Sequence, residues 1–350
     1  MATIKNPFLK QFEERKVAHI ELALSTKNQA IGFSGLDQIS LIHEALPDLN
    51  FNDININSKI LGHSLKTPFY IASMTAGHEK SNHLNTLLAL AAEMRGWAMG
   101  VGSQRRELLE PQNQTIWQDI RKIAPNAILF GNIGLAQAIL SKPSDIERLS
   151  DNLQAQGMII HLNALQECLQ PEGTPQFKGG YAALERLSKS LSVPIIIKET
   201  GCGMSEATLQ RLKNLGIQAV DISGLVGTHW GRIEGERSGL GHPLATAAET
   251  FRNWGISTLT SLTAAVTLKP NYEIWASGGV RSGLDAAKLL ALGANAVGFA
   301  KPILQSALKG FDKLLTQMET YEYELKIALF CTNSANIKQL QENHICHIIN

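Results

Sequence analysis

Eight short apolar or β-branched runs alternate with longer segments of helical periodicity, and this alternation limits the possible folds more than any other feature of the chain. It is the pattern of parallel strands joined by crossover helices. The runs are FYIASMT (69–75), WAMGVGS (97–103), ILFGNIG (128–134), GMIIHLN (157–163), PIIIKET (194–200), AVDISG (219–224), YEIWASGG (272–279) and AVGFAKP (296–302). Eight βα units predict an α/β fold, a closed (β/α)8 TIM barrel. In a doubly wound sheet the strand order would reverse once, and the sequence shows no linker or midpoint break that would mark such a reversal.

Three segments between the runs end in glycine, as helices commonly do. LNTLLALAAEMRG (84–96), SEATLQRLKNLG (205–216) and SGLDAAKLLALG (282–293) have helical periodicity and a terminal glycine. We expect each to be a helix on the outside of the barrel.

The chain extends beyond the barrel at both ends. The alternating segment 56–69 predicts an edge strand or hairpin, and the residues after about 303 predict helices and a polar tail. We therefore expect an N-terminal extension (1–68), the barrel (69–305) and a C-terminal helical segment (306–350).

Composition excludes several classes of protein. The 350 residues are 44% hydrophobic and 18% charged, which is typical of a soluble globular protein, and 32 basic against 31 acidic side chains argue against a nucleic-acid partner. Cys168, Cys202, Cys331 and Cys346 show no CxxC spacing, so we expect reduced thiols and no structural zinc site. The N-terminus lacks the apolar run of a signal peptide and no stretch is long enough to span a membrane, which predicts a cytoplasmic protein.

Polar side chains gather where the predicted strands end. In a barrel of this kind, catalytic groups lie at the C-terminal ends of the strands. Such residues follow the first six strands: Ser73, Met74 and Thr75; Ser103, Gln104 and Arg105; Asn132; His161 and Asn163; Lys198, Glu199 and Thr200; and Ser223. The alternative is that they only cap strand ends and the helices that follow.

A glycine-rich turn follows the seventh strand. Ser277-Gly278-Gly279-Val280-Arg281 leads into a helix, so its amides and the helix N-terminus can approach an anion. Ala300 and Lys301 end the eighth strand, and loops after strands seven and eight often bind phosphate in such barrels. The alternative is a tight turn with a solvated arginine.

Lys198 ends an apolar strand, where an ammonium group needs an acceptor. It could form a Schiff base, or it could face the electron-rich edge of a flavin, and the neighbouring phosphate site favours flavin mononucleotide (FMN). The alternative is a simple pairing with Glu199.

HLNALQE (161–167) places a histidine, two amides and a carboxylate in seven positions after a buried strand. Glu167 beside phosphates is typical of a magnesium ligand, although a glutamate at a helix start is the alternative. Arg15 and Lys16 lie outside the barrel, and two adjacent bases alone usually mark a solvated surface.

Taken together, these motifs resemble the type 2 isopentenyl-diphosphate isomerase family over residues 12 to 305. The motifs are RKVAHI (15–20), SMTAG (73–77), GVGSQR (100–105), FGNIG (130–134), HLNALQE, KETGCG (198–203), SGLVGTHW (223–230) and SGGVRSG (277–283). The family is an FMN-dependent (β/α)8 enzyme that interconverts isopentenyl and dimethylallyl diphosphate and needs reduced flavin and magnesium. NADPH would only reduce the flavin, and the family is commonly a homotetramer or octamer.

The resemblance implies a role for each matching residue. The FMN would be held by Met74, Thr75, Ala76, Ser103, Asn132, Lys198, Ser223, Thr228, Gly278, Gly279, Val280, Arg281, Ala300 and Lys301. The diphosphate would be faced by Arg15, Lys16, Ser103, Gln104, Arg105, His161, Asn163 and Gln166. Gln166, His161 and Asn163 would be catalytic, Glu167 would bind Mg²⁺, and residues 1–68 would contribute to the substrate site.

Two positions depart from the family pattern. Ala76 and Val226 stand where glycine is usual, and Val226 would be strained at positive φ.

Two other functions compete with the isomerase. An FMN-dependent 2-hydroxy-acid oxidase needs a His-Gly-Gly-Arg run where this chain has GTHWGR, so His229 is the one similarity. A non-catalytic flavin-binding barrel would need neither Arg15-Lys16 nor Glu167.

Overall fold

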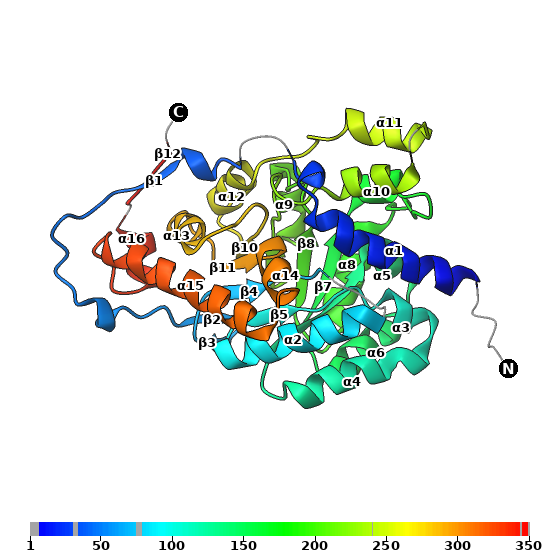
Figure 1. Cartoon of the computed structure of the whole chain (residues 1–350), viewed down its shortest axis with the longest axis horizontal. Helices are drawn as coiled ribbons and strands as arrows, with labels where there is room; N and C mark the ends of the chain where they lie inside the picture. The colour runs from blue at the N-terminus through cyan, green and yellow to red at the C-terminus, as the bar shows by residue number, and fades with distance from the viewer. Residues whose placement is uncertain (1–6, 31–33, 75–78, 240, 344, 349–350) are drawn as a thin grey trace.

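Eight parallel strands close into a barrel in the computed structural model, which describes residues 7–30, 34–74, 79–239, 241–343 and 345–348. The strands follow one another in chain order, and the ladder between the last and the first closes the barrel. Figure 1 shows the strands at the centre with helices around them. They are β4 Phe69–Ile71, β5 Ala98–Gly100, β6 Ile128–Gly134, β7 Gly157–Leu162, β8 Ile195–Glu199, β9 Ala219–Asp221, β10 Glu273–Ala276 and β11 Ala296–Phe299. The predicted (β/α)8 TIM barrel is confirmed, and each predicted run contains one of these strands.

The barrel strands are apolar on both faces because both faces are covered. Ile196 lies in the core inside the barrel with Phe130 and Trp275, whereas Ile195 and Ile197 pack in the layer between the strands and the helices. Side chains alternate between these faces along the strand, so an uninterrupted apolar run marks a strand buried on both sides. The strands are shorter than most of the predicted runs because the polar residues at the ends of those runs lie in loops.

Helices surround the barrel and connect its strands. They are α2 Glu79–Arg95, α3 Arg105–Leu109, α4 Gln114–Ile123, α5 Leu135–Leu140, α6 Pro143–Leu153, α7 Ala164–Leu169, α8 Gly180–Ser190, α9 Glu206–Leu212, α10 Trp230–Ser238, α11 Pro243–Thr250, α12 Thr258–Thr267, α13 Gly283–Ala291 and α14 Lys301–Ala307, with the 3-10 turn η4 Pro111–Asn113. The three helices predicted from glycine-terminated segments are confirmed as α2, α9 and α13. Helix α9 ends at Leu212, earlier than predicted, and the chain turns before Gly216, whose φ is +69°.

A hairpin closes the N-terminal end of the barrel. Strands β2 (Ser58–Ile60) and β3 (His63–Leu65) pair antiparallel, which confirms the hairpin predicted for residues 56–69. Ile60 and Leu65 join the core inside the barrel, and the backbone N–H of Leu61 donates to Glu273. The hairpin therefore fills one barrel end and leaves the opposite end for the site.

The remaining segments cover the barrel from outside. Helix α1 (Pro7–Leu24) packs against α10 and α14, and the short elements η1 Thr26–Asn28, η2 Leu36–Gln38, β1 Ile39–Leu41 and η3 Phe51–Asp53 follow it. The chain continues after α14 with α15 (Phe311–Phe330) and α16 (Ile337–Glu342), and ends in β12 (Cys346–Ile348), which pairs with β1. The last described residues thus form a strand where the sequence predicted a polar tail. Among the described residues, no helix is both long and apolar enough to cross a membrane.

One buried arginine joins several of these elements. Arg121 on α4 is 7% exposed and donates to five backbone carbonyls and one side-chain amide: Ala124, Pro125, Ala127, Leu153, Gln154 and the Oε1 atom of Gln156. These acceptors lie at the ends of α4 and α6 and before β6 and β7, so a single side chain fixes how two helices meet two strands.

We predict that Arg121→Met lowers the free energy of unfolding by about 3 kcal/mol, because it leaves several buried carbonyls without donors. Equilibrium urea unfolding followed by circular dichroism measures the change. The exposed neighbour Lys122 pairs with Asp119 on the helix surface, so Lys122→Met is the matched control and should change little. A loss for Arg121→Met as small as that of the control would contradict this account.

Candidate active site

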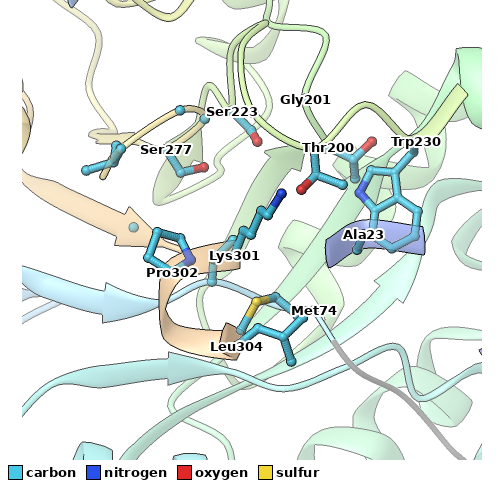
Figure 2. Close-up of a pocket in the computed structure, with 18 of the residues that line it drawn as sticks. Ala23, Met74, Thr200, Gly201, Ser223, Trp230, Ser277, Lys301, Pro302 and Leu304 are labelled. Atoms are coloured by element: carbon cyan, nitrogen blue, oxygen red, sulfur yellow. The ribbon is translucent and has the colours of Figure 1, made fainter. Parts of the chain in front are cut away.

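Two joined cavities open at the C-terminal end of the barrel. The first has a volume of about 410 Å³ and is lined by α1, α14 and the loops after β8 to β11. Figure 2 shows Trp230 beside Ala23 of α1, with Met74 and Leu304 on another wall. The second, of about 100 Å³, shares Lys16, His19, Ser73, Met74, Lys198, Thr200 and Trp230 with the first. A ligand in the first cavity could therefore contact a second ligand in the other cavity.

Most residues predicted to hold FMN line these cavities. The first is lined by Met74, Lys198, Ser223, Thr228, Gly278, Gly279, Val280, Arg281, Ala300 and Lys301. Ser103 and Asn132 line the second. Thr75 and Ala76 lie outside the described residues.

The glycine turn after β10 lies on the wall of the first cavity and packs closely against the loop after β9. Gly278 and Gly279 have φ of +96° and +76°, and a Cβ atom at Gly278 would lie 2.3 Å from the backbone oxygen of Gly224. Arg281 and Lys301 line the same cavity, and burial, followed by the nearby Arg281, lowers the pKa of Lys301. Backbone amides and two cations suit a phosphate.

The Oγ atom of Ser73 is a further polar group in both cavities. It is buried and has no hydrogen-bond partner among the described residues. A buried polar group of this kind is expected to bind a ligand or water. Together with the glycine turn, it fits a phosphorylated cofactor such as FMN.

The partner of Lys198 is a residue that sequence reasoning missed. Its Nζ atom lies 2.7 Å from Oδ2 of Asp221 on the neighbouring strand β9. The alternative pairing with the Glu199 carboxylate is wrong, since that carboxylate accepts the backbone N–H groups of residues 200–203. Burial raises the pKa of Glu199 to about 7, although these hydrogen bonds and the charge of Lys198 act to lower it.

The second cavity is rich in cations. Arg15, Lys16, Arg105 and Lys198 line it with Ser103, His161, Asn163, Gln166 and Glu167. Burial, followed by the adjacent Arg15, lowers the pKa of Lys16 to about 7. Such a concentration of positive charge favours a multiply charged anion.

Gln104 does not line either cavity, contrary to its predicted contact with substrate. Its side chain is 1% exposed and donates to the Leu149 carbonyl and to Glu107, while it accepts the backbone N–H of Asn132. It therefore supports strand β6 at Asn132.

His161 is held as a neutral base by its surroundings. Its Nδ1 atom lies 2.8 Å from Oδ1 of Asn132, whose Nδ2 donates to the Val101 carbonyl, so Nδ1 carries the proton. Burial, followed by the charges of Lys16 and Lys198, lowers the pKa of His161 to about 3. The neutral ring keeps Nε2 as an acceptor at neutral pH.

Glu167 is the single carboxylate among the predicted site residues of the second cavity. Its Oε1 accepts from Nδ2 of Asn163 at 2.9 Å, and its Oε2 accepts from the backbone N–H of Thr174. Within the described ranges, no group of three or more His, Cys, Asp or Glu side chains could enclose a metal. A metal bound by Glu167 would therefore take its other ligands from a substrate and water, as Mg²⁺ often does.

A second buried carboxylate, Glu234 on α10, was not predicted. It accepts from Nε2 of Gln166 at 2.8 Å and lies 2.9 Å from Nε2 of His19 on α1. Burial alone would raise its pKa, but His19, Arg237 and Gln166 bring the pKa to about 2. Glu234 thus joins Gln166 on α7 to the N-terminal helix α1.

Signals for this network are present in the sequence but are weak. His19 follows Lys16 by three residues and Arg15 by four, so a helix places all three on one face. Arg237 contacts both Glu234 and Glu172, and Arg15 lies 3.5 Å from Glu172. The pairing of Glu234 with His19 spans more than two hundred residues, and no local pattern indicates it.

The loop after β9 carries the strain expected at Val226. Val226 has φ of +131° and is 5% exposed, and Ser223 has φ of +33°. The loop is tied to the segment after α1, because Ala30 donates to the Gly227 carbonyl and Gln29 bridges Thr228. Ser223 and Thr228 both remain on the wall of the first cavity.

The class of protein follows from comparison of the sequence and fold with known proteins. The sequence model of the FMN-dependent dehydrogenase family matches residues 161–347. A solved flavocytochrome b2 variant with pyruvate bound has a TM-score of 0.68 at 17% identity, covering 96% of this chain and 82% of its own. A mandelate oxidase variant with a monooxide FMN adduct has a TM-score of 0.62 at 14% identity, covering 92% and 90%. The fold is that of an FMN-dependent dehydrogenase barrel.

Closer relatives define the family within that class. Isopentenyl-diphosphate delta-isomerase of Legionella pneumophila is 54% identical over 332 residues, 95% of this chain and 97% of the relative. The enzyme of the same name from Bdellovibrio bacteriovorus is 52% identical over 342 residues, 96% and 98% of the two chains. The chain belongs to the isopentenyl-diphosphate delta-isomerase family, which confirms the resemblance found in its motifs.

We predict that acid weakens the fold through His19. Burial lowers the pKa of this residue from 6.5 to about 4. Between these values the unfolded chain binds a proton that the folded protein does not, so the free energy of unfolding falls as the pH falls through this window. The contribution of His19 is up to about 3 kcal/mol.

Urea unfolding at successive pH values tests this. His19→Gln should make the fall between pH 6.5 and 4 less steep, while the part due to the buried His161 remains, and His43→Gln, at an exposed loop position, should keep the wild-type profile. Identical pH profiles for His19→Gln and the wild type would show that another group is responsible.

Proposed function

We propose that this protein interconverts isopentenyl diphosphate and dimethylallyl diphosphate with FMN and Mg²⁺, as the name of its relatives indicates. The observation that carries the proposal is the pairing of two cavities. One has the glycine turn and two cations that suit a flavin phosphate, and the other has cations and one carboxylate that suit a metal-bound diphosphate.

FMN would occupy the first cavity. Arg281, Lys301 and the Gly278–Gly279 amides would hold its phosphate, and Lys198 would face its ring. In its reduced form the bound flavin would supply acid–base chemistry for moving the double bond, with NADPH only reducing it beforehand.

The diphosphate would occupy the second cavity. Arg15, Lys16 and Arg105 would neutralise it, and Glu167 would hold Mg²⁺ against its oxygens. The neutral Nε2 of His161 and the Asn163 amide would complete its polar surroundings.

Moving the double bond needs one proton added and another removed, with no net oxidation. Burial, followed by Glu199, raises the pKa of Cys202, so that thiol stays protonated. Gln166, which lines the second cavity and donates to Glu234, would orient the alkene or relay a proton.

Several further features belong to the proposal. Residues 1–68 would complete the substrate site around the barrel of residues 69–305, with residues 306–350 as a C-terminal segment. The protein would act in the cytoplasm as a homo-oligomer, a tetramer or octamer.

The histidine that the oxidase alternative needs, in the GTHWGR segment, does not reach the cavities. His229 is 1% exposed, accepts the backbone N–H of Arg232 and faces the Trp254 carbonyl, so it caps α10 and lines neither cavity. A non-catalytic flavin-binding barrel would not account for the cations that line the second cavity.

An anaerobic assay tests the function. The protein is incubated with chemically reduced FMN, Mg²⁺ and isopentenyl diphosphate, without NADPH, and dimethylallyl diphosphate is quantified over time. We expect product that depends on reduced FMN. No product from protein with reduced FMN demonstrably bound would reject the isomerase and require a screen of oxidisable substrates.

The same assay tests the residue proposed to act on the alkene. Gln166→Ala with intact FMN binding should lose turnover by about tenfold or more. Full turnover would remove Gln166 from the mechanism.

We predict that Glu167→Gln raises the Mg²⁺ concentration needed for half-maximal activity by about tenfold or more, because an amide oxygen is a much weaker ligand than a carboxylate. A magnesium titration of initial rates measures this. Glu206→Gln, an exposed change on α9, is the matched control. A titration curve unchanged by Glu167→Gln would place the metal elsewhere.

A further inference from the structure

Asp221 is a carboxylate enclosed in the barrel, below the site already described. It is 0% exposed and is the last residue of β9. Its Oδ2 atom accepts from the Tyr70 hydroxyl at 2.6 Å and lies 2.7 Å from Nζ of Lys198. Its Oδ1 atom accepts from the Ser277 hydroxyl at 2.7 Å and from the backbone N–H of Ser223 at 3.2 Å. The donors come from different parts of the barrel, yet they converge on one anion.

The network around Asp221 is closed. A carboxylate offers about four lone-pair sites, and four donors use them. The ammonium group of Lys198 has three N–H groups, and it contacts Asp221, the Ser277 hydroxyl and the Glu199 carbonyl. Burial and the nearby Asp221 raise the pKa of Tyr70, so its hydroxyl remains a donor. A fully satisfied buried network holds its members in one geometry.

Three residues that contact Asp221 also line the first cavity. They are Lys198, Ser223 and Ser277. Ser223 has φ of +33°, a conformation that costs energy for a residue with a side chain, and its N–H bond to Asp221 stabilises that turn. Asp221 and Tyr70 line neither cavity, so their effect on a ligand can only be indirect.

We propose that Asp221 is a positioning residue for the cofactor, a buried anion that holds the Lys198 ammonium, Ser277 and the Ser223 turn against the FMN ring. This inference rests on the proposed function, because it takes the first cavity as the FMN site. Asp221 supplies a negative charge beside the buried ammonium of Lys198 and so keeps this cation in place.

A positioning role differs measurably from a merely structural one. If Asp221 only fills the barrel core, its replacement and that of Lys198 should weaken FMN binding independently. If it acts through Lys198, most of its effect should disappear once Lys198 is removed, because coupled residues are not additive.

The test is a double-mutant cycle on FMN affinity. Equilibrium dialysis measures FMN binding to the wild type, Asp221→Asn, Lys198→Met and the double variant. We expect Asp221→Asn to raise the FMN dissociation constant by about tenfold or more, because it leaves a buried ammonium without its counter-charge. In the Lys198→Met background the same change should have little effect. Asp151→Asn, the same chemical change at an exposed position on α6, should bind FMN as the wild type does.

Two results would overturn the proposal: wild-type FMN affinity in Asp221→Asn, or losses in the two single variants that simply add in the double variant. Should Asp221→Asn not fold, Tyr70→Phe provides the test, because it keeps both charges and removes one donor from Asp221. The carboxylate, with its charge unchanged but one donor fewer to screen it, should then lower the reduction potential of bound FMN, and an unchanged potential would overturn the proposal. A wild-type protein that binds no FMN would instead reject the proposed function itself.

Discussion

The ladder between β11 and β4 is the contact on which the rest of the structure depends. It pairs Val297 with Phe69 and Phe299 with Ile71 and so joins the last barrel strand to the first. Parallel strands require crossover helices on the outside, which leaves the C-terminal strand ends free to form one ring of loops. Ser73 and Lys301, more than two hundred residues apart, meet in one cavity only because this ladder closes the ring.

The buried acids around the ring are of two kinds, which differ in the groups that contact their carboxylates. Asp221 and Glu234 each lie against a cation or a histidine of the protein, and these contacts offset the cost of burying them. Glu167 is different, since the donors to its carboxylate among the described residues are amide N–H groups. Its charge is oriented by these bonds but remains available to a cation that the protein does not supply.

Much of this arrangement was predictable because strand ends are local features. A buried run marks a strand, and closure of the barrel then places the polar residue at its end, as at His161 and Lys198. The direction of a side chain was less predictable. Gln104 and Arg105 follow the same strand, but only Arg105 reaches the cavity, whereas Gln104 points into the protein. Partners from distant strands and helices, such as Asp221 for Lys198 and Glu234 for His19, could not be found because no local pattern records a contact made only by folding.

Helix α1 shows why a site of this kind depends on charged contacts for its shape. The helix brings Arg15, Lys16 and His19 to the cavities. Hydrophobic packing tolerates small shifts, but polar contacts weaken steeply with distance and angle, so the contacts of Arg15 with Glu172 and of His19 with Glu234 restrict the position of the helix. A slip of one residue would place Ala18 where His19 faces Glu234, and the buried carboxylate would lose that polar contact. The acids on α10 and after α7 therefore determine which residues of α1 reach the cavity.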